Sequence, residues 1–339
     1  MSLKEDINFS LWCDFIERDF LENQFQDLIK NETIQGATSN PAIFASSISN
    51  SVAYKQQLEM LQANTAKTIY EELATTDIKR AAELLEDMYK NDNDDGFISL
   101  EVDPTLCDDA QGTIEEGVRL FKTLAHDNVM IKVPATEAGY EAMKELTSQG
   151  INVNATLIFS PLQAVKCAKA LNEGIKASNK DTKAVISVFV SRFDRMCDSE
   201  LLAKGLKPGK LGIINATKCY HEVKKIGNKN IRTLFASTGV KGNELAGSYY
   251  VDNLIFPDSV NTAPLSTIED WLEDGKKEPS KILSESDCDK YVEDLISHKV
   301  DLNRVYNTLL SDGLESFKES FKDLLSKLQK NYINFSNVS

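Results

Sequence analysis

A lysine inside an apolar segment is the residue whose type and position most clearly suggest chemistry. Lys132 occurs in the run Val-Met-Ile-Lys-Val-Pro at 129–134. Burial disfavours the charged form of an amine, and a neutral amine near pH 7 can attack a ketone to form a Schiff base. The alternative is a lysine at a strand end that extends its ammonium group into solvent. The position alone leaves both interpretations open.

Other polar residues also lie inside or just after apolar segments. Taken singly, such residues are more often helix caps or turn formers. Taken together they predict one polar pocket, because polar groups inside a fold need hydrogen-bond partners. The set consists of Asp14, Asn40, Glu101, Asn154, Thr156, Ser187, Arg192 and Ser237.

Short apolar segments alternate with longer amphipathic ones along the chain, and each has the length of a strand buried on both faces. This alternation predicts an α/β protein with a closed (β/α)8 TIM barrel, whose active site lies at the carboxyl ends of the strands. An open doubly wound sheet is the alternative, but its GxGxxG phosphate fingerprint is absent from the sequence. The predicted strands are 9–13, 33–37, 96–102, 129–133, 153–159, 184–190, 233–236 and 259–263.

Helix patterns fill the intervals and exceed the simple repeat in two places. Extra helices are predicted at about 41–93 and in a C-terminal extension at about 266–335, within a single domain of residues 1–339. Thr113 with Glu116 predicts a capping box, and Ser160 before a proline predicts another helix start. The last helix has an apolar stripe that we expect to dock on the barrel, a dimer contact being the alternative. The stripe consists of Phe317, Phe321, Leu324, Leu325 and Leu328.

Composition limits the partners that the protein can have. The 38 basic and 52 acidic residues give a formal charge of −14, which repels nucleic acid and anionic membranes. An anionic substrate would therefore need a local group of cations. The chain lacks a signal-peptide pattern and an apolar span of membrane length, so we expect it to be cytoplasmic. We further expect a monomer or a homodimer.

Cysteine and histidine spacing predicts neither a metal nor a cofactor. The six cysteines are scattered, as is typical of reduced structural thiols. His126, His221 and His298 are far apart, without the spacing of metal ligands. No P-loop occurs.

Eight segments match motifs of one enzyme family in the family's order, from about residue 8 to 265. They are LWCDFIERDF, GATSNPAIF, SLEVDP, MIKVPATEAG, INVNATLIFS, ISVFVSRFDR, FASTGVKG and NTAP. On these motifs the chain resembles the transaldolase family, most closely its longer bacterial subfamily with ASTGVK. The resemblance implies a transferase of the non-oxidative pentose phosphate pathway. Such an enzyme moves a dihydroxyacetone unit from sedoheptulose 7-phosphate or fructose 6-phosphate to glyceraldehyde 3-phosphate or erythrose 4-phosphate, without a cofactor.

The resemblance also implies catalytic roles. Lys132 corresponds to the Schiff-base lysine, and Asp14 to the acid/base that removes the proton of the C4 hydroxyl. Glu101 and Thr156 correspond to the pair that holds a catalytic water. Residues that correspond to substrate-binding positions are Asn40 and Asn154 for the dihydroxyacetone unit, Ser187 for the wall of the site, and Arg192 and Ser237 for the phosphate.

The chain departs from the family pattern after its seventh strand. Other branches place a second arginine two residues after the serine, where this chain has Gly239. We expect Lys241, with backbone amides of the same loop, to replace that arginine as a point charge on phosphate. The alternative is a solvated lysine.

Phe189 helps to distinguish an enzyme that transfers the dihydroxyacetone unit from one that releases it. Related short aldolases that release dihydroxyacetone have a tyrosine at the matching place and a glutamine in place of Glu101. The sequence therefore favours a transferase, with fructose 6-phosphate aldolase activity as the alternative. A barrel that only binds sugar phosphates is a second alternative, but binding alone does not require a buried nucleophile such as Lys132.

Overall fold

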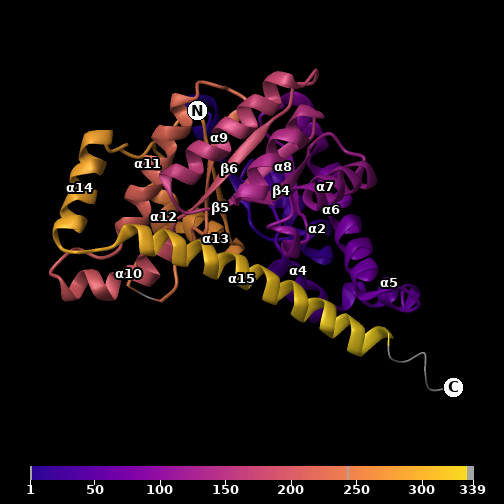
Figure 1. Ribbon diagram of the computed structural model, residues 1–339. Coiled ribbons are helices and arrows are strands. Elements are labelled where there is room, and N and C mark those ends of the chain that lie inside the picture. The colour runs from indigo at the N-terminus through magenta and orange to yellow at the C-terminus, as the bar shows by residue number, and fades with distance from the viewer. Residues whose placement is uncertain (1, 243, 334–339) are drawn as a thin grey trace.

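The computed structural model describes residues 2–242 and 244–333 and shows eight parallel strands closed into a barrel (Figure 1). Each strand pairs with the next in the sequence, and β8 pairs with β1. This confirms the predicted (β/α)8 fold. The strands are β1 Ser10–Cys13, β2 Gly36–Thr38, β3 Phe97–Glu101, β4 Val129–Pro134, β5 Asn152–Ile158, β6 Ala184–Phe189, β7 Ile231–Ala236 and β8 Ser259–Ala263.

The strand residues are buried along their whole length, as expected for a barrel covered by helices. The predicted boundaries are close to the observed ones except at β2, which begins three residues later than 33. There the amides of Thr33 and Ile34 both donate to the carbonyl of Leu28, and Glu32 has a positive φ of 55°. These residues end the preceding helix, so they cannot join the sheet.

Helices cover the outside of the barrel and extend it where the sequence predicts, after β2 and at the C-terminal end (Figure 1). The helices are α1 Leu3–Ile7, α2 Arg18–Glu22, α3 Gln24–Lys30, α4 Pro41–Asn50, α5 Lys55–Met60, α6 Ala66–Asn91, α7 Ala110–Leu124, α8 Glu137–Ser148, α9 Pro161–Ala177, α10 Ser191–Ala203, α11 Leu211–Lys225, α12 Tyr249–Asp252, α13 Leu265–Asp274, α14 Glu285–Ser297 and α15 Leu302–Leu328. Shorter turns are the 3-10 helices η1 Val52–Tyr54 and η2 Pro104–Leu106 and the π-helical turn η3 Gln329–Ile333.

One of the two predicted helix starts is confirmed and the other is wrong. Ser160 caps α9 in a capping box with Gln163. Thr113 lies inside α7, where its hydroxyl donates to the carbonyl of Leu106 at 3.0 Å. The cap of α7 is instead Asp109, whose carboxylate accepts from the amide three residues later.

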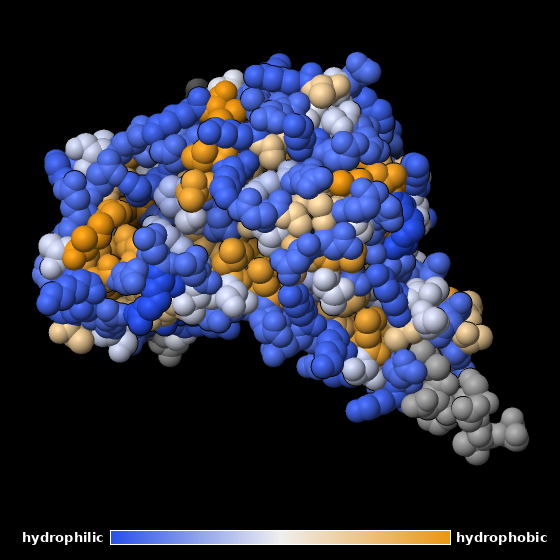
Figure 2. All heavy atoms as spheres, in the orientation of Figure 1, coloured by the Kyte–Doolittle hydropathy of each residue, from blue (hydrophilic) through white to orange (hydrophobic). Residues whose placement is uncertain are grey.

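The long helix α15 crosses the molecule from α10 to α4, which follow β6 and β2 respectively (Figure 1). Phe317, Phe321, Leu324 and Leu328 are buried, and Leu325 packs against the same core. The predicted apolar stripe therefore docks within its own chain. Outside this contact the visible face is mostly hydrophilic, with separate apolar patches (Figure 2). Of the described helices, none has the length and apolarity needed to cross a bilayer.

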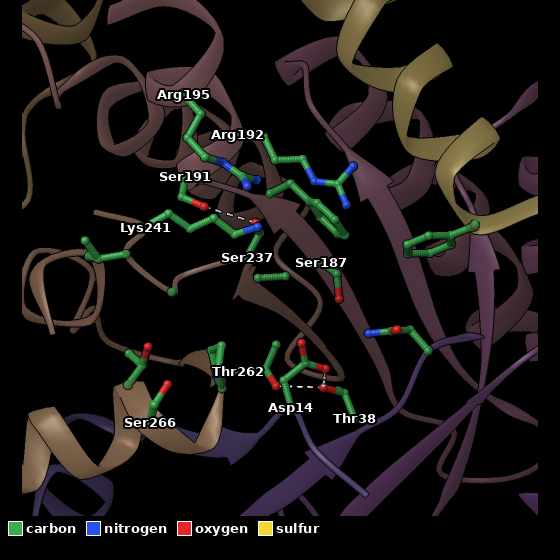
Figure 3. A pocket seen from close by; sticks show the side chains of 18 of the residues that line it. Asp14, Thr38, Ser187, Ser191, Arg192, Arg195, Ser237, Lys241, Thr262 and Ser266 are labelled. Atoms are coloured by element: carbon green, nitrogen blue, oxygen red, sulfur yellow. Dashed lines mark hydrogen bonds between the residues drawn. The ribbon is translucent and has the colours of Figure 1, made fainter. Parts of the chain in front are cut away.

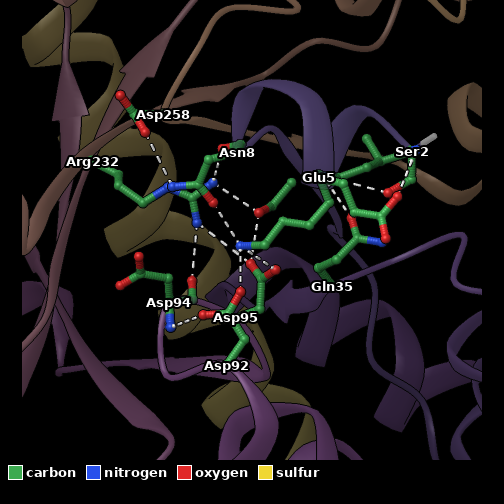
Figure 4. Close-up of polar contacts among 12 residues, drawn as sticks. Ser2, Glu5, Asn8, Gln35, Asp92, Asp94, Asp95, Arg232 and Asp258 are labelled. Atoms are coloured by element: carbon green, nitrogen blue, oxygen red, sulfur yellow. Dashed lines mark hydrogen bonds and ion pairs between the residues drawn. The ribbon is translucent and has the colours of Figure 1, made fainter.

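A buried polar network fills the amino-terminal end of the barrel (Figure 4). Its centre is Arg232 of β7, which is 5% exposed. The guanidinium donates to the carbonyls of Asn8 and Ser259 at 2.7 and 2.8 Å and to the Ser10 hydroxyl at 2.8 Å. It also lies 3.4 Å from the carboxylate of Asp95. One arginine thus ties β1, β7, β8 and the turn before β3 together.

Candidate active site

A cavity of about 350 Å³ opens at the carboxyl ends of the barrel strands. Side chains from strands, from the turns that follow them and from α10, α13 and α15 form its wall (Figure 3). Most of the predicted site residues line it: Asp14, Asn40, Lys132, Ser187, Phe189, Arg192, Ser237 and Lys241.

Lys132 extends from β4 into this cavity and is 5% exposed. Its amine donates to the carbonyl of Ser39 at 3.0 Å and lies 3.7 Å from Oε2 of Glu101. The side chain therefore does not extend into bulk solvent, which excludes one of the two sequence-based interpretations. A buried amine that faces a cavity can act as a nucleophile toward a carbonyl group in that cavity.

Glu101 lies beside Lys132 but is not among the side chains that line the cavity. The two residues are in register on β3 and β4. Burial raises the pKa of Glu101 from its ordinary 4.5 to about 7; the charge of Lys132 opposes this rise and that of Asp14 adds to it. Among the described residues, Oε2 has no hydrogen-bond partner. Glu101 can therefore gain or lose a proton near neutral pH.

Replacing Glu101 with glutamine should change how stability depends on pH. A raised pKa means that the folded protein holds a proton that the unfolded chain releases between pH 4.5 and 7. The free energy of unfolding should thus fall by roughly 3 kcal/mol as the pH rises through that window. The E101Q variant lacks this contribution, so its stability relative to wild type should increase over the same range.

Urea unfolding of both proteins at about pH 5 and about pH 8 measures the difference. A difference between the two proteins that stays constant across this range would contradict the raised pKa of Glu101.

Asp14 follows β1 and faces the same cavity. Its Oδ1 accepts a hydrogen bond of 2.7 Å from the hydroxyl of Thr38, which lies 2.7 Å from the hydroxyl of Thr262 (Figure 3). Two hydroxyl groups from β2 and β8 thus fix the orientation of the carboxylate. Among the described residues that line the cavity, Asp14 is the only carboxylate, and this placement suits a general acid or base.

Side-chain amides form a second part of the site. The hydroxyl of Ser187 donates to Oδ1 of Asn154 at 2.6 Å, and Nδ2 of Asn154 donates to the hydroxyl of Ser99 at 3.0 Å. Asn154 is fully buried behind Ser187. Asn40 lines the cavity and also caps α4, because its Oδ1 accepts from the amide of Ile43. Asn40 therefore both caps α4 and forms part of the cavity wall.

Of the predicted site residues, Thr156 has the weakest connection to the rest of the site. It lies on β5 two residues after Asn154, is fully buried and does not line the cavity. Its hydroxyl has no hydrogen-bond partner among the described residues. A buried hydroxyl without a partner is unusual, and Glu101 has an unpaired oxygen of the same kind.

The opposite wall of the cavity is cationic (Figure 3). Arg192 and Lys241 lie there near Ser237, whose hydroxyl is 3.1 Å from that of Ser191. Ser237 has a positive φ of 55°, a strained conformation for a residue other than glycine. Basic groups and hydroxyls in one wall suit a phosphate.

Arg192 is held between neighbouring groups. Its guanidinium lies 5.0 Å from the ring centre of Phe189, a cation–π distance. Burial lowers the pKa of Arg192, and the positive charge of Arg195 lowers it further. The two guanidinium groups are thus close enough to influence each other.

Among the lining residues that sequence reasoning missed, Arg195 and Phe317 bear most on the character of the cavity. Arg195 follows Arg192 by three positions on α10, a spacing that places both on one helix face and was visible in the sequence. Phe317 comes from the apolar stripe of α15. No local signal shows that one member of such a stripe reaches a site some 185 residues away from Lys132 in the sequence.

Comparisons with known proteins show which family the chain belongs to. The family model for transaldolase/fructose-6-phosphate aldolase matches residues 11–328. The chain is 48% identical to a transaldolase of Helicobacter pylori (strain ATCC 700392 / 26695) over 318 residues, which cover 94% of this chain and 98% of that protein. It is 46% identical to a transaldolase of Campylobacter jejuni subsp. doylei over 332 residues, which cover 95% and 99% of the two chains. The chain therefore belongs to the transaldolase/fructose-6-phosphate aldolase family of enzymes, as its motifs predict.

Proposed function

We propose that the protein transfers a dihydroxyacetone unit between sugar phosphates through a Schiff base on Lys132. The observation that carries this proposal is the buried amine of Lys132, at the inner end of a cavity that also contains Asp14. The donors are sedoheptulose 7-phosphate and fructose 6-phosphate. The acceptors are glyceraldehyde 3-phosphate and erythrose 4-phosphate, as in the non-oxidative pentose phosphate pathway.

The first step joins substrate and enzyme. The amine of Lys132 attacks C2 of the ketose, and the resulting carbinolamine loses water to give a protonated imine. Glu101 is 3.7 Å from the amine and has a pKa of about 7, so it can donate the proton that the departing hydroxide needs. We assign Glu101 and Thr156, each with an unpaired buried oxygen, to the water that delivers this proton.

The second step breaks a carbon–carbon bond. Asp14 takes the proton of the C4 hydroxyl, C4 becomes the carbonyl of the departing aldehyde, and the electrons of the C3–C4 bond move into the imine to form an enamine. The positive imine withdraws electrons far more strongly than a ketone, and this lowers the barrier. The acceptor aldehyde then enters, and the same steps run in reverse.

Different groups at the two ends of the cavity position the substrate. Asn40 and the hydrogen-bonded pair of Ser187 and Asn154 are placed for the hydroxyls of the three-carbon unit. The cationic wall with Arg192 and Ser237 is placed for the phosphate. A substrate held at both ends keeps its C2 carbonyl in the reach of Lys132.

Transfer requires that the enamine not be hydrolysed before the acceptor arrives. Phe189 packs edge-on against Phe159 at a ring distance of 5.3 Å, and its side chain offers no hydroxyl to hold a hydrolytic water. The assay is the release of free dihydroxyacetone from fructose 6-phosphate, with and without erythrose 4-phosphate. We expect fast transfer and little release; substantial release without an acceptor would favour the fructose 6-phosphate aldolase alternative.

Replacing Lys241 with alanine should raise KM for fructose 6-phosphate, because a point charge next to the phosphate is lost. We expect a rise of about threefold to tenfold, since the side chain is exposed and solvent screens its charge. The kcat should change little. Steady-state kinetics of K241A test this, and an unchanged KM would remove Lys241 from the phosphate site.

We further propose that the enzyme acts in the cytoplasm on free sugar phosphates, as a monomer or homodimer, without nucleic-acid or membrane partners. All six cysteines are unpaired and buried, which is typical of proteins in reducing compartments. The formal charge of −14 disfavours binding to polyanions.

A further inference from the structure

We propose that Arg195 is a specificity-determining residue that pairs with the substrate phosphate together with Arg192. In this way α10 supplies the second arginine that the chain lacks at Gly239. This inference rests on the proposed function and adds to it a residue that neither the motifs nor the resemblance assigns.

Arg192 and Arg195 differ from the other arginines because they have no carboxylate partner among the described residues. Arg18, Arg80, Arg119, Arg232 and Arg304 each form an ion pair with a carboxylate. Arg192 and Arg195 are the remaining arginines, and neither forms an ion pair within the described residues. Both line the substrate cavity. In a chain with a formal charge of −14, two neighbouring unpaired guanidiniums indicate an anion from outside the protein.

The geometry of α10 brings the two guanidiniums to one place. Arg192 and Arg195 are three positions apart and so share a helix face. They lie in the first turns of α10, directly after Ser191, whose hydroxyl pairs with that of Ser237 at 3.1 Å. The positive end of the helix dipole adds to their charge. Figure 3 shows both side chains on the side of the cavity that holds this hydroxyl pair.

Mutual repulsion of these side chains supports an external anion. The charge of Arg195 contributes to the lowered pKa of Arg192, and Asp312 on α15 offsets this only in part. A phosphate dianion between the guanidiniums would remove the repulsion and accept hydrogen bonds from both. Lys241 is exposed and offers only a point charge, whereas a guanidinium can bind a phosphate in a bidentate manner.

The loop after β7 explains why this arginine comes from α10. A Cβ atom at Gly239 would lie 3.0 Å from Cγ of Pro264 and 3.5 Å from the hydroxyl of Thr267. The space beside Gly239 is thus filled by the start of α13, and a long side chain there would have to displace Pro264. The second guanidinium instead comes from α10, whose Arg195 lines the same cavity.

The test compares R195Q and R195K with the matched control R304Q. Arg304 also contacts α10, through an exposed ion pair with Glu200, and it does not line the cavity. For each protein, KM and kcat are measured with fructose 6-phosphate and erythrose 4-phosphate. Binding of inorganic phosphate is measured separately by the shift in Tm during a phosphate titration, which does not depend on catalysis.

We expect R195Q to raise KM for fructose 6-phosphate and to weaken phosphate binding, each by about tenfold or more, with kcat within about threefold of wild type. R195K should show a smaller rise, because it keeps the charge and loses the bidentate geometry. R304Q should match wild type in both measurements. If R195Q matches R304Q in both measurements, or if K241A alone weakens phosphate binding, the proposal is wrong.

Failure of the proposed function would look different. In that case the wild-type protein would not transfer dihydroxyacetone at all, while the phosphate titration of R195Q and R304Q would still report on Arg195. Equal loss of phosphate binding in R195Q and R304Q would show a general effect of lost positive charge and would also contradict a specific role for Arg195.

Discussion

Replacing Lys132 with methionine should abolish transfer, lowering kcat by roughly 10⁴-fold or more, because Lys132 is the buried amine beside Glu101 and Asp14, whereas the other amine that lines the cavity, that of Lys241, is exposed on the cationic wall. Methionine has a similar length and no charge, so it should fill the same buried space. Glu101, with a pKa of about 7, can remain protonated beside it. The K132M protein should therefore fold and bind fructose 6-phosphate without converting it.

Two further variants show that the amine itself is required. Lys132→Arg keeps a positive charge but cannot form an imine, so it should be as inactive as K132M. Lys183→Met removes another buried lysine, which pairs with Asp94 at 2.8 Å just before β6, at the opposite end of the barrel. It should lower stability and leave kcat within about threefold of wild type. Substantial transfer by K132M or K132R would contradict the covalent mechanism.

Replacing Arg232 with methionine should produce the largest loss of stability that we expect from a single substitution, about 3–5 kcal/mol. The guanidinium donates to three backbone carbonyls and the Ser10 hydroxyl and lies beside Asp95, whose side chain is 3% exposed. Its loss removes the donor of these backbone carbonyls at a buried position, and among the described residues the carboxylate of Asp95 keeps only its contacts with Lys4 and Ser10. Urea unfolding at pH 7 measures the change.

Arg80→Met is the matched control for this loss. Arg80 forms an ion pair with Glu22 at 2.6 Å, but both side chains are exposed, and such pairs contribute about 0–1 kcal/mol. Because Arg232 lies at the amino-terminal end of the barrel, R232M should keep its kcat at temperatures where it remains folded. A stability within about 1 kcal/mol of R80M would show that the network of Arg232 is not essential to the fold.

The sequence predicted the barrel well because its strands carry a signal that does not depend on distant contacts. A strand covered on both faces is a short apolar run, and such runs lie within two residues of every observed start except that of β2. The misplacement at β2 arose because Thr33 and Ile34 have strand-forming side chains but serve to end α3. Strand propensity alone cannot show whether such a residue joins a strand or ends the preceding helix.

The capping box at Thr113 failed for a related reason. Its pattern is correct, but Glu116 accepts from the amide of Asp103 at 2.7 Å and pairs with Lys67 at 2.9 Å. Both partners lie outside α7, and Asp109 offers a cap one turn earlier. A long-range contact thus took the side chain that the local pattern assigned to the cap.

The candidate site was predicted unevenly. Polar residues at strand ends pointed to the cavity, because all parallel strands of a barrel end at one rim. Their depth was not predictable: Glu101 and Asn154 lie behind the residues that line the cavity. Phe317 depends on how α15 crosses the rim, which is set by packing along its whole length. Such contacts are properties of the assembled fold.

Trapping with borohydride tests the central claim most directly. Borohydride reduces an imine to a stable secondary amine, so the protein incubated with fructose 6-phosphate and borohydride should gain the mass of a reduced adduct. Peptide mapping should place that adduct on Lys132, the buried amine beside Glu101. Absence of an adduct, or an adduct confined to another lysine, would contradict the account.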